Sequence, residues 1–201
     1  MPPAPAHVHL ETRRLVLREL RPADLAAVHA WAADPEVVRY EPWGPNTPEQ
    51  TAEYLKRSLA ARGEEPRSLF ELGFVLKETE GLIGAGGLRI RSREHSEADI
   101  GYTLRRDAWG RGYATEAAGA LVELGLRLGL HRIWATCHVD NLRSARVLEK
   151  LGMRREGRLR ENVLQRGVWR DSYLYAVVAG DPGLPSVVVA ASIPGGALSG
   201  P

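Results

Sequence analysis

The chain reads IGYTLRRDAWGRGYATE from Ile100 to Glu116, a strand pattern that runs through a basic, glycine-rich turn into a helix beginning near Tyr113. Backbone N–H groups at the start of a helix have no partners within it, and the helix dipole makes that end partly positive. Gly110 and Gly112 let the backbone approach an anion closely, and Arg111 adds positive charge. The turn is therefore suited to bind a phosphate or pyrophosphate, although an ordinary strand-to-helix turn has the same short pattern.

Two common phosphate-binding loops do not fit this turn. A Walker loop places Gly-Lys-Ser/Thr after its glycines, and residues 100–116 lack that tripeptide. A dinucleotide-binding loop has the pattern GxGxxG at the first of several parallel strand-helix-strand units. Here Thr115 stands in place of the third glycine, and the flanking pattern gives a single parallel step.

The patterns on either side of the turn predict an α+β fold. Short connections favour antiparallel neighbours among the strands, and one helix joins two parallel strands, so we expect a mixed, mostly antiparallel sheet of about seven strands with flanking helices. Gly84–Gly87 falls inside a strand and indicates a bulge or a close backbone approach. The expected strands are 14–20, 69–77, 82–91, 99–104, 132–139, 153–159 and 169–178, and the expected helices begin at 22, 48, 113 and 141.

The composition is that of a folded domain, with 201 residues of which 44% are hydrophobic and 26% charged. Lys and Arg number 27 against 25 Asp and Glu, an excess too small to indicate a nucleic-acid partner. Cys137 is the single cysteine, which excludes an internal disulfide and a cysteine-based zinc site. The six histidines have no metal-ligand spacing, so we expect no metal.

The sequence divides into three parts. Residues 1–10 are a flexible lead-in rich in Pro and Ala, residues 11–179 hold the globular domain, and residues 180–201 form a Pro/Gly/Ala/Ser-rich tail. No apolar run is long enough to cross a membrane, and the start lacks the apolar core of a signal peptide. We therefore expect a cytoplasmic protein with no membrane partner, as a monomer or homodimer.

Several segments together resemble the GNAT superfamily of N-acetyltransferases. WGRGYATEA at 109–117 is similar to its acyl-CoA-binding motif, and VDNLRSARVLEKLGM at 139–153 is similar to its second CoA motif. The opening ETRRLVLR at 11–18 and the segments 155–161 and 167–175 are similar to its ribosomal-protein-alanine N-acetyltransferase branch, RimJ/RimL-like. The resemblance covers roughly residues 10–178, and Trp109, where the superfamily has Gln or Arg, is familiar in that branch.

The resemblance implies acetyl-CoA as the co-substrate. The turn would hold the pyrophosphate by its backbone, Thr103 and Leu104 would bind the pantetheine arm through the main chain, and a splay between their strand and 132–139 would admit the thioester. Asn141 would bind the cofactor arm, although as a residue it is also a good helix N-cap. The implied cofactor-binding residues are Thr103, Leu104, Trp109, Gly110, Arg111, Gly112, Tyr113, Ala114, Thr115 and Asn141.

The chemistry implied is attack of a neutral amine on a thioester, which needs a base, oxyanion stabilisation and a proton for the leaving thiolate. Many members use a tyrosine as the acid, but no tyrosine lies between Tyr113 and Tyr173. Ser144 is the candidate acid and Glu161 the candidate base, each with a surface role as the alternative. Cys137 is expected to be a buried apolar residue rather than a nucleophile.

The acceptor is implied to be an amine, most simply a protein N-terminus as in the ribosomal-protein branch. Tyr40, Trp43 and Tyr54 fall in the region that walls the acceptor pocket in this superfamily, and Glu116 is expected to complement the helix dipole. Two alternatives stay open: a small amine such as an antibiotic, polyamine or amino acid, and an acyl-CoA-binding module without turnover. A peptide acceptor predicts an open, acidic groove between residues 34–48 and the terminal hairpin, whereas a small amine predicts a closed pocket.

Overall fold

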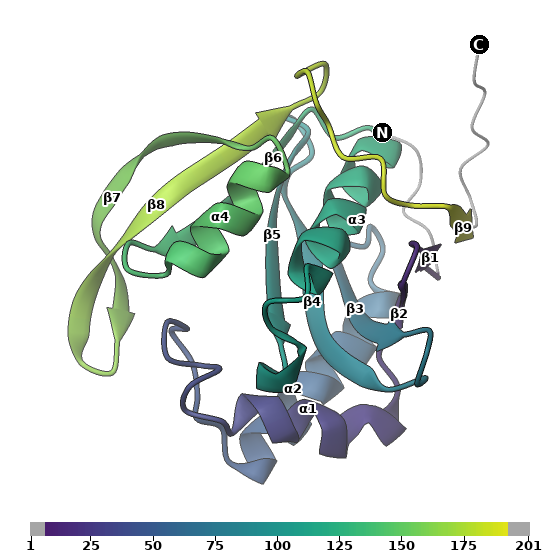
Figure 1. Cartoon of the computed structure of the whole chain (residues 1–201), viewed down its shortest axis with the longest axis vertical. Coiled ribbons are helices and arrows are strands. Elements are labelled where there is room, and N and C mark those ends of the chain that lie inside the picture. Colours follow the sequence, from purple (N-terminus) through teal and green to yellow (C-terminus); the bar gives the residue numbers. More distant parts are fainter. Residues whose placement is uncertain (1–6, 193–201) are drawn as a thin grey trace.

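The computed structural model describes residues 7–192, so parts of the predicted lead-in (1–6) and tail (193–201) lie outside the described residues. One sheet runs through the described part in the order β7-β8-β6-β5-β4-β3-β2-β1-β9, with helices on both sides (Figure 1). Every neighbouring pair of strands is antiparallel except β5 and β6. The α+β class and the single parallel step are confirmed, with two short edge strands beyond the seven expected.

The N-terminal third contains two short strands, β1 and β2, followed by helices. Asp24 fixes the first turn of η1, because its carboxylate accepts from the Arg21 N–H at 2.7 Å and from the Arg18 guanidinium at 2.7 and 2.9 Å. The predicted capping box is present at α2, where the Thr47 hydroxyl accepts from the Gln50 N–H at 3.3 Å. The elements are β1 (His9–Glu11), β2 (Leu15–Glu19), η1 (Pro22–Asp24), α1 (Leu25–Ala32), α2 (Pro48–Ala60) and η2 (Ala61–Gly63).

Three antiparallel strands form the centre of the sheet: β3 (Leu69–Leu76), β4 (Leu82–Ser92) and β5 (Glu97–Leu104). The glycines of β4 allow a close approach to β5, as the sequence predicts. A Cβ at Gly84 would lie 2.4 Å from the Thr103 carbonyl oxygen, and one at Gly86 would lie 2.5 Å from the Gly101 carbonyl oxygen. A register shift between Phe74 and Val75 leaves Ile83 as an extra residue of β4, a bulge next to the glycine cluster.

The parallel step places the ends of two strands apart from each other. After β5 come η3 (Arg106–Ala108), α3 (Tyr113–Arg127) and β6 (Arg132–His138). β5 and β6 pair only from Glu97–Asp99 to Arg132–Trp134, although β5 continues to Leu104 and β6 to His138. The predicted splay is therefore present over the last residues of both strands.

The C-terminal part consists of α4 (Leu142–Lys150) and the long hairpin β7 (Arg154–Gln165) and β8 (Val168–Val178). Positive φ angles at Arg166 (48°) and Gly167 (79°) make the tight turn at its tip. β7 runs six residues further than the sequence indicated, and register shifts between Arg155 and Gly157 and between Leu159 and Val163 bend it. In Figure 1 the hairpin arches away from the rest of the sheet.

The segment after β8 returns along α3 to the opposite edge of the sheet (Figure 1). The carboxylate of Glu123 accepts the N–H groups of Val187 and Val188, each at 3.0 Å, and β9 (Ala190–Ser192) then pairs with β1. Leu184, Val187 and Val188 pack against the main core. Residues 184–192 of the region expected to be a tail are therefore part of the folded structure.

Two apolar clusters occupy the two faces of the sheet. The larger cluster joins the strands to α3 and α4 through residues such as Phe70, Leu121 and Leu148, which are fully buried. The smaller one joins α1 and α2 to the sheet through Val28, Leu55 and Ala85, among others. No helix within residues 7–192 is long and apolar enough to span a membrane.

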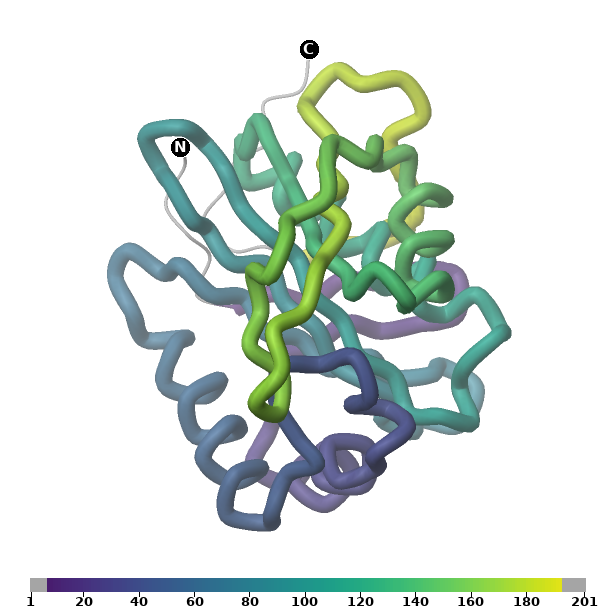
Figure 2. Tube along the Cα trace, turned by 90° about the vertical axis from the view of Figure 1, so that its left-hand side faces the viewer, coloured from purple at the N-terminus to yellow at the C-terminus, as the bar shows by residue number. Residues whose placement is uncertain are grey.

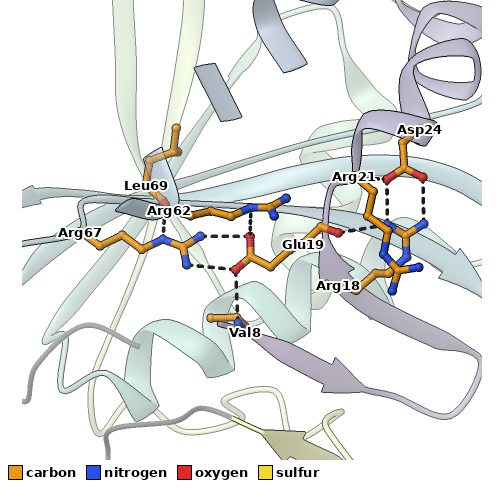
Figure 3. A network of polar contacts seen from close by, with 8 residues as sticks. All are labelled: Val8, Arg18, Glu19, Arg21, Asp24, Arg62, Arg67 and Leu69. Carbon is orange, nitrogen blue, oxygen red and sulfur yellow. Dashed lines mark hydrogen bonds and ion pairs between the residues drawn. The ribbon is translucent and has the colours of Figure 1, made fainter. Parts of the chain in front are cut away.

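An ionic network ties the segment after α2 to β2 (Figure 3). Glu19 accepts from Arg67 Nη1 at 3.0 Å and from the Val8 N–H at 3.2 Å, and it pairs with Arg62 Nε at 3.2 Å. Arg67 Nε donates to the Leu69 carbonyl at 2.8 Å, where β3 begins. The network has a structural role, because it joins three segments that are distant in sequence.

Candidate active site

The turn before α3 has the shape expected of an anion-binding turn. Gly110 has a φ of 74° and Gly112, the N-cap of α3, a φ of 80°, in the left-handed region that favours glycine. A Cβ at Gly110 would have nothing within 4 Å, so the turn faces open space there. No side chain caps the helix, and its first N–H groups, from Tyr113 on, stay available to a ligand.

Hydrogen bonds of Arg14 and Glu116 hold the turn in place. Glu116 accepts hydrogen bonds from the Thr12 hydroxyl at 2.6 Å, from the Arg14 N–H at 2.7 Å and from Arg14 Nε at 2.7 Å. Arg14 Nη1 donates to the Arg111 carbonyl at 2.9 Å, and its guanidinium lies 4.5 Å from the centre of the Tyr113 ring. Burial would raise the pKa of Glu116, but the hydrogen bonds from Thr12 and Arg14 outweigh it and lower that pKa. Glu116 therefore fastens the turn to β2, a role beyond complementing the helix dipole.

Trp109 packs against the strand end instead of projecting from the turn. Its Nε1 donates to the Leu104 carbonyl at 2.9 Å, and Arg143 of α4 lies 5.2 Å from its ring centre. Thr103 and Leu104 lie where β5 has parted from β6, paired with Ala85 and Gly84 of β4. The Leu104 carbonyl is thus already used by Trp109.

A cavity of about 160 Å³ opens where β5 and β6 diverge. Residues of β5, β6, α4, the hairpin and the loop between α1 and α2 all contribute to its walls. The polar and ionisable residues lining it are Tyr40, Glu41, Tyr102, Thr136, Cys137, His138, Asn141, Ser144, Gln165, Arg170 and Ser172. A group carried between the two strands would reach this cavity, which places the chemistry here.

Ser144 and Asn141, two residues expected at the site, both line the cavity. The Ser144 hydroxyl lies 3.1 Å from the Tyr102 hydroxyl, and the Asn141 side-chain oxygen accepts from the Ser144 N–H at 3.1 Å. Burial raises the pKa of Tyr102 above its usual range, and the hydrogen bond with Ser144 opposes part of that rise. Tyr102 is therefore protonated at neutral pH, and the Tyr102–Ser144 pair can pass a proton. Asn141 is the N-cap of α4, and it also faces the cavity.

The β6 side of the cavity contributes His138 and Cys137. The Tyr40 and His138 rings lie 5.1 Å apart, and the His138 Nδ1 accepts from the Asp140 N–H at 3.1 Å. That contact leaves Nδ1 without a proton. Burial raises the pKa of Cys137 to about 11, so it is a thiol at neutral pH rather than a nucleophile.

Glu41 is the one residue with a carboxylate among the described residues that line the cavity. It lies in the loop between α1 and α2, beside Tyr40. Removal from water raises the pKa of Glu41 to about 7. It is thus near half-ionised at neutral pH, which suits a group that exchanges protons.

The tip of the hairpin closes the cavity by binding this same loop (Figure 2). Gln165 donates to the carbonyls of Arg39 and Glu41 at 2.9 and 2.8 Å. Arg166 donates to the carbonyls of Val38 and Gly44 at 3.0 and 2.9 Å. We call residues 165 and 166 with the loop carbonyls the clasp.

Three residues expected at the site lie elsewhere. Trp43 is 38% exposed, and Tyr54 donates to Glu71 of β3 at 2.6 Å; neither lines the cavity. Glu161 is exposed, at a φ of 48° in the bent part of β7, where its N–H donates to Asp171 at 2.8 Å. The structure does not bring it to the cavity, because the register shift after Leu159 turns this part of the strand outward.

Sequence reasoning missed Tyr102, Glu41 and Gln165. Tyr102 stands in the quoted stretch, two residues before the strand end, and the parallel step predicts that this strand borders the splay. This position beside the splay could have identified Tyr102 as a site residue. Glu41 lies on a loop and Gln165 at the end of β7, and their contact joins residues more than 120 positions apart, so no local pattern could have found them.

An anion-binding turn at the start of α3 and a gap between two diverging strands are features suited to a thioester on a long arm that carries a pyrophosphate, which indicates an acyl-CoA-dependent transferase. Comparison with known protein families identifies which class of transferase this is. The model of the acetyltransferase (GNAT) domain matches residues 14–154, and the chain belongs to that family. It is an N-acetyltransferase that uses acetyl-CoA, and within residues 7–192 no group of side chains could hold a metal ion.

Known proteins similar to the chain span nearly all of it. An uncharacterized N-acetyltransferase of Bacillus subtilis, YnaD, is 33% identical over 85% of this chain and 97% of its own length. A GNAT-family acetyltransferase structure from Bacillus anthracis has a TM-score of 0.75 at 32% identity, covering 85% and 98% of the two chains. The ribosomal protein uS5-alanine N-acetyltransferase of Escherichia coli is 26% identical over 87% of this chain and 92% of its own.

Proposed function

We propose that this N-acetyltransferase acetylates the primary amine of a small molecule whose far end carries no positive charge. The observation that carries the proposal is the clasp. A peptide acceptor requires an open groove between residues 34–48 and the hairpin, and four hydrogen bonds of 2.8–3.0 Å bridge that gap. The space behind the clasp, about 160 Å³, has room for the amine end of a small molecule.

The charge near the cavity argues against polyamines. Residues 154–178, which form the hairpin, contain six arginines and three acidic residues. Arg170 of this hairpin lines the cavity while exposed to solvent, so it lies at the mouth. A second ammonium group on the acceptor would meet this positive charge, whereas a neutral or carboxylate end would not.

The chain's own residues supply the remaining chemistry. The amides at the start of α3 would hold the pyrophosphate, and bound acetyl-CoA supplies an activated acetyl group. Ser144 with Tyr102 would give a proton to the leaving sulfur, because both hydroxyls face the cavity at the splay. The walls of the cavity exclude water and so protect the thioester from hydrolysis.

A protein N-terminus is the second candidate. It is favoured by the similarity to the uS5-alanine N-acetyltransferase, which covers 87% of this chain. An N-terminal residue alone could enter the cavity if the clasp opened. The two candidates differ in whether the clasp stays closed during turnover.

The test measures release of CoA with a thiol reagent, using butylamine, alanine amide, free alanine, spermidine and a ten-residue peptide beginning with alanine. The enzyme adds little background because Cys137 is buried, with 6% of its surface exposed. We expect the small monoamines to have a kcat/KM at least about tenfold above the peptide and spermidine. The peptide as the best acceptor would overturn the proposal in favour of the second candidate.

Arg170→Gln tests the charge argument. Removing the cation at the mouth should raise kcat/KM for spermidine by about tenfold, the equivalent of about 1.4 kcal/mol, and leave butylamine nearly unchanged. Arg154→Gln is the matched control, since Arg154 lies on the same hairpin but pairs with Asp181 and does not line the cavity. Equal effects of the two variants would contradict a role for Arg170 in selectivity.

A further inference from the structure

Glu41 is held in a fixed place by its backbone, while its carboxylate is left free. Its carbonyl accepts from Gln165 at 2.8 Å, and Gln165 is itself 7% exposed. Within residues 7–192 no hydrogen bond or ion pair reaches the Glu41 carboxylate, although it lines the cavity. Glu41 is half-buried, and a carboxylate that lines a cavity without a partner among the described residues is free to receive a cationic ligand.

The groups around Glu41 cannot replace it. The ionisable residues that face the cavity are Tyr40 on the same loop, Tyr102 on β5, Cys137 and His138 on β6, and Arg170 on β8. Tyr102 and Cys137 stay protonated at neutral pH, as described above. His138 Nδ1 is occupied by the Asp140 N–H at 3.1 Å, and Asp140 Oδ2 lies 3.7 Å from the same nitrogen.

We propose that Glu41 binds the ammonium group of the acceptor and takes one proton from it, leaving the neutral amine in the cavity. This inference rests on the proposed function and assigns the base that the acetyl transfer needs. It also sets a requirement on the acceptor, whose amine enters as a cation through a mouth bordered by Arg170. Glu41 and Arg170 both line the cavity and Arg170 is the more exposed of the two, an arrangement that suits an amine with an uncharged or anionic far end.

Glu41, Tyr102, Ser144 and solvent account for every proton that moves in the reaction. The ammonium gives one proton to the Glu41 carboxylate, and the free nitrogen pair forms the bond to the acetyl carbon. The bond from that carbon to sulfur breaks, and the second nitrogen proton passes to solvent as the amide forms. The Tyr102–Ser144 pair delivers a proton to the sulfur and takes one back from solvent, so the hydroxyl pair ends the cycle protonated as it began. Glu41 returns its proton to solvent before the next cycle.

The test is the pH dependence of kcat/KM for butylamine in the wild-type enzyme, Glu41→Gln and Glu41→Asp. The wild-type value should rise as the pH rises through about 7, then level off as Glu41 becomes fully ionised. Glu41→Gln should lose about a hundredfold at pH 7.5. Its kcat/KM should rise without a plateau toward the amine's own pKa of roughly 10. Glu41→Asp should restore the plateau.

Glu36→Gln is the matched control, because Glu36 is an exposed carboxylate on the same loop, outside the cavity. Calorimetry should show unchanged acetyl-CoA binding in all variants, which establishes that each is folded. A Glu41→Gln enzyme that keeps the wild-type plateau would overturn the inference while the acetyltransferase assignment stands. A wild-type enzyme that binds acetyl-CoA but releases no CoA with any of the amines would overturn the proposed function, and the inference with it.

Discussion

Glu116 illustrates how a single side chain prepares a binding turn. Four atoms of residues 12 and 14 converge on its carboxylate or on the neighbouring Arg111 carbonyl, at 2.6–2.9 Å. The strained glycine turn is thereby fixed before any ligand arrives. Pre-organisation of this kind lowers the entropy lost on binding.

Glu116→Gln should weaken acetyl-CoA binding by about tenfold or more, because removing one partner of a largely buried ion pair costs about 3 kcal/mol and frees Arg14. Calorimetry measures the dissociation constant directly. Asp107→Asn is the control, since Asp107 pairs with Arg105 at 2.6 Å on the exposed side of the same turn. A Glu116→Gln enzyme with wild-type affinity would show that the turn holds its shape without the contact.

At the scale of elements, the hairpin turns an open sheet edge into a closed cavity. The tip of the hairpin lies beside the loop between α1 and α2 (Figure 2). Side chains of the tip donate hydrogen bonds to carbonyls of that loop. The β7 register shifts supply the bend that brings the tip over the splay. The cavity therefore depends on contacts between two elements that are more than 120 residues apart in the sequence.

Gln165→Ala should raise KM for the amine by about tenfold, because two hydrogen bonds of about 1 kcal/mol each no longer hold the loop over the cavity. KM for acetyl-CoA should not change, since its pyrophosphate site lies at α3. Steady-state kinetics with each substrate varied in turn gives both values. Leu164→Ala, at a neighbouring position 53% exposed, is the control. Equal rises in both KM values would mean that the clasp supports the fold rather than the acceptor site.

At the scale of the whole molecule, the C-terminal segment completes the fold. Glu123 of α3 binds it midway, and β9 covers the outer edge of β1. The carboxylate of Glu123 also accepts from Arg127 Nε at 3.2 Å, so both of its oxygens are used. The segment stabilises the half of the sheet that is remote from the cavity.

A chain that ends at Gly183 should unfold at a temperature lower by roughly 5–10 °C, from the loss of about 3 kcal/mol of packing and hydrogen bonding. Calorimetric melting of the truncated and full chains measures the difference. Val189→Ala, at a position 69% exposed, should melt like the wild type. Acetyl-CoA binding should persist below the melting transition, and an unchanged melting temperature would contradict this account of the segment.

The sequence by itself determined most of the fold and the donor site. Most of these features depend on a few neighbouring residues, so the sequence predicts them directly. They are the strand and helix periods, the Thr47 capping box, the β4 glycines and the turn at 110–112. The parallel step followed from the single strand-helix-strand pattern, and the splay from the family resemblance. These features predict the pyrophosphate site without reference to distant parts of the chain.

Only the tertiary structure decided the acceptor site. Glu161 and Tyr54 looked suitable by position along the chain, but a register shift turns one outward and a contact with Glu71 holds the other against β3. Glu41 became relevant because Gln165, 124 residues away, fixes its loop over the splay. Residues 184–192 joined the sheet through Glu123. Such contacts depend on how folded elements pack against one another. Short stretches of sequence therefore do not predict them.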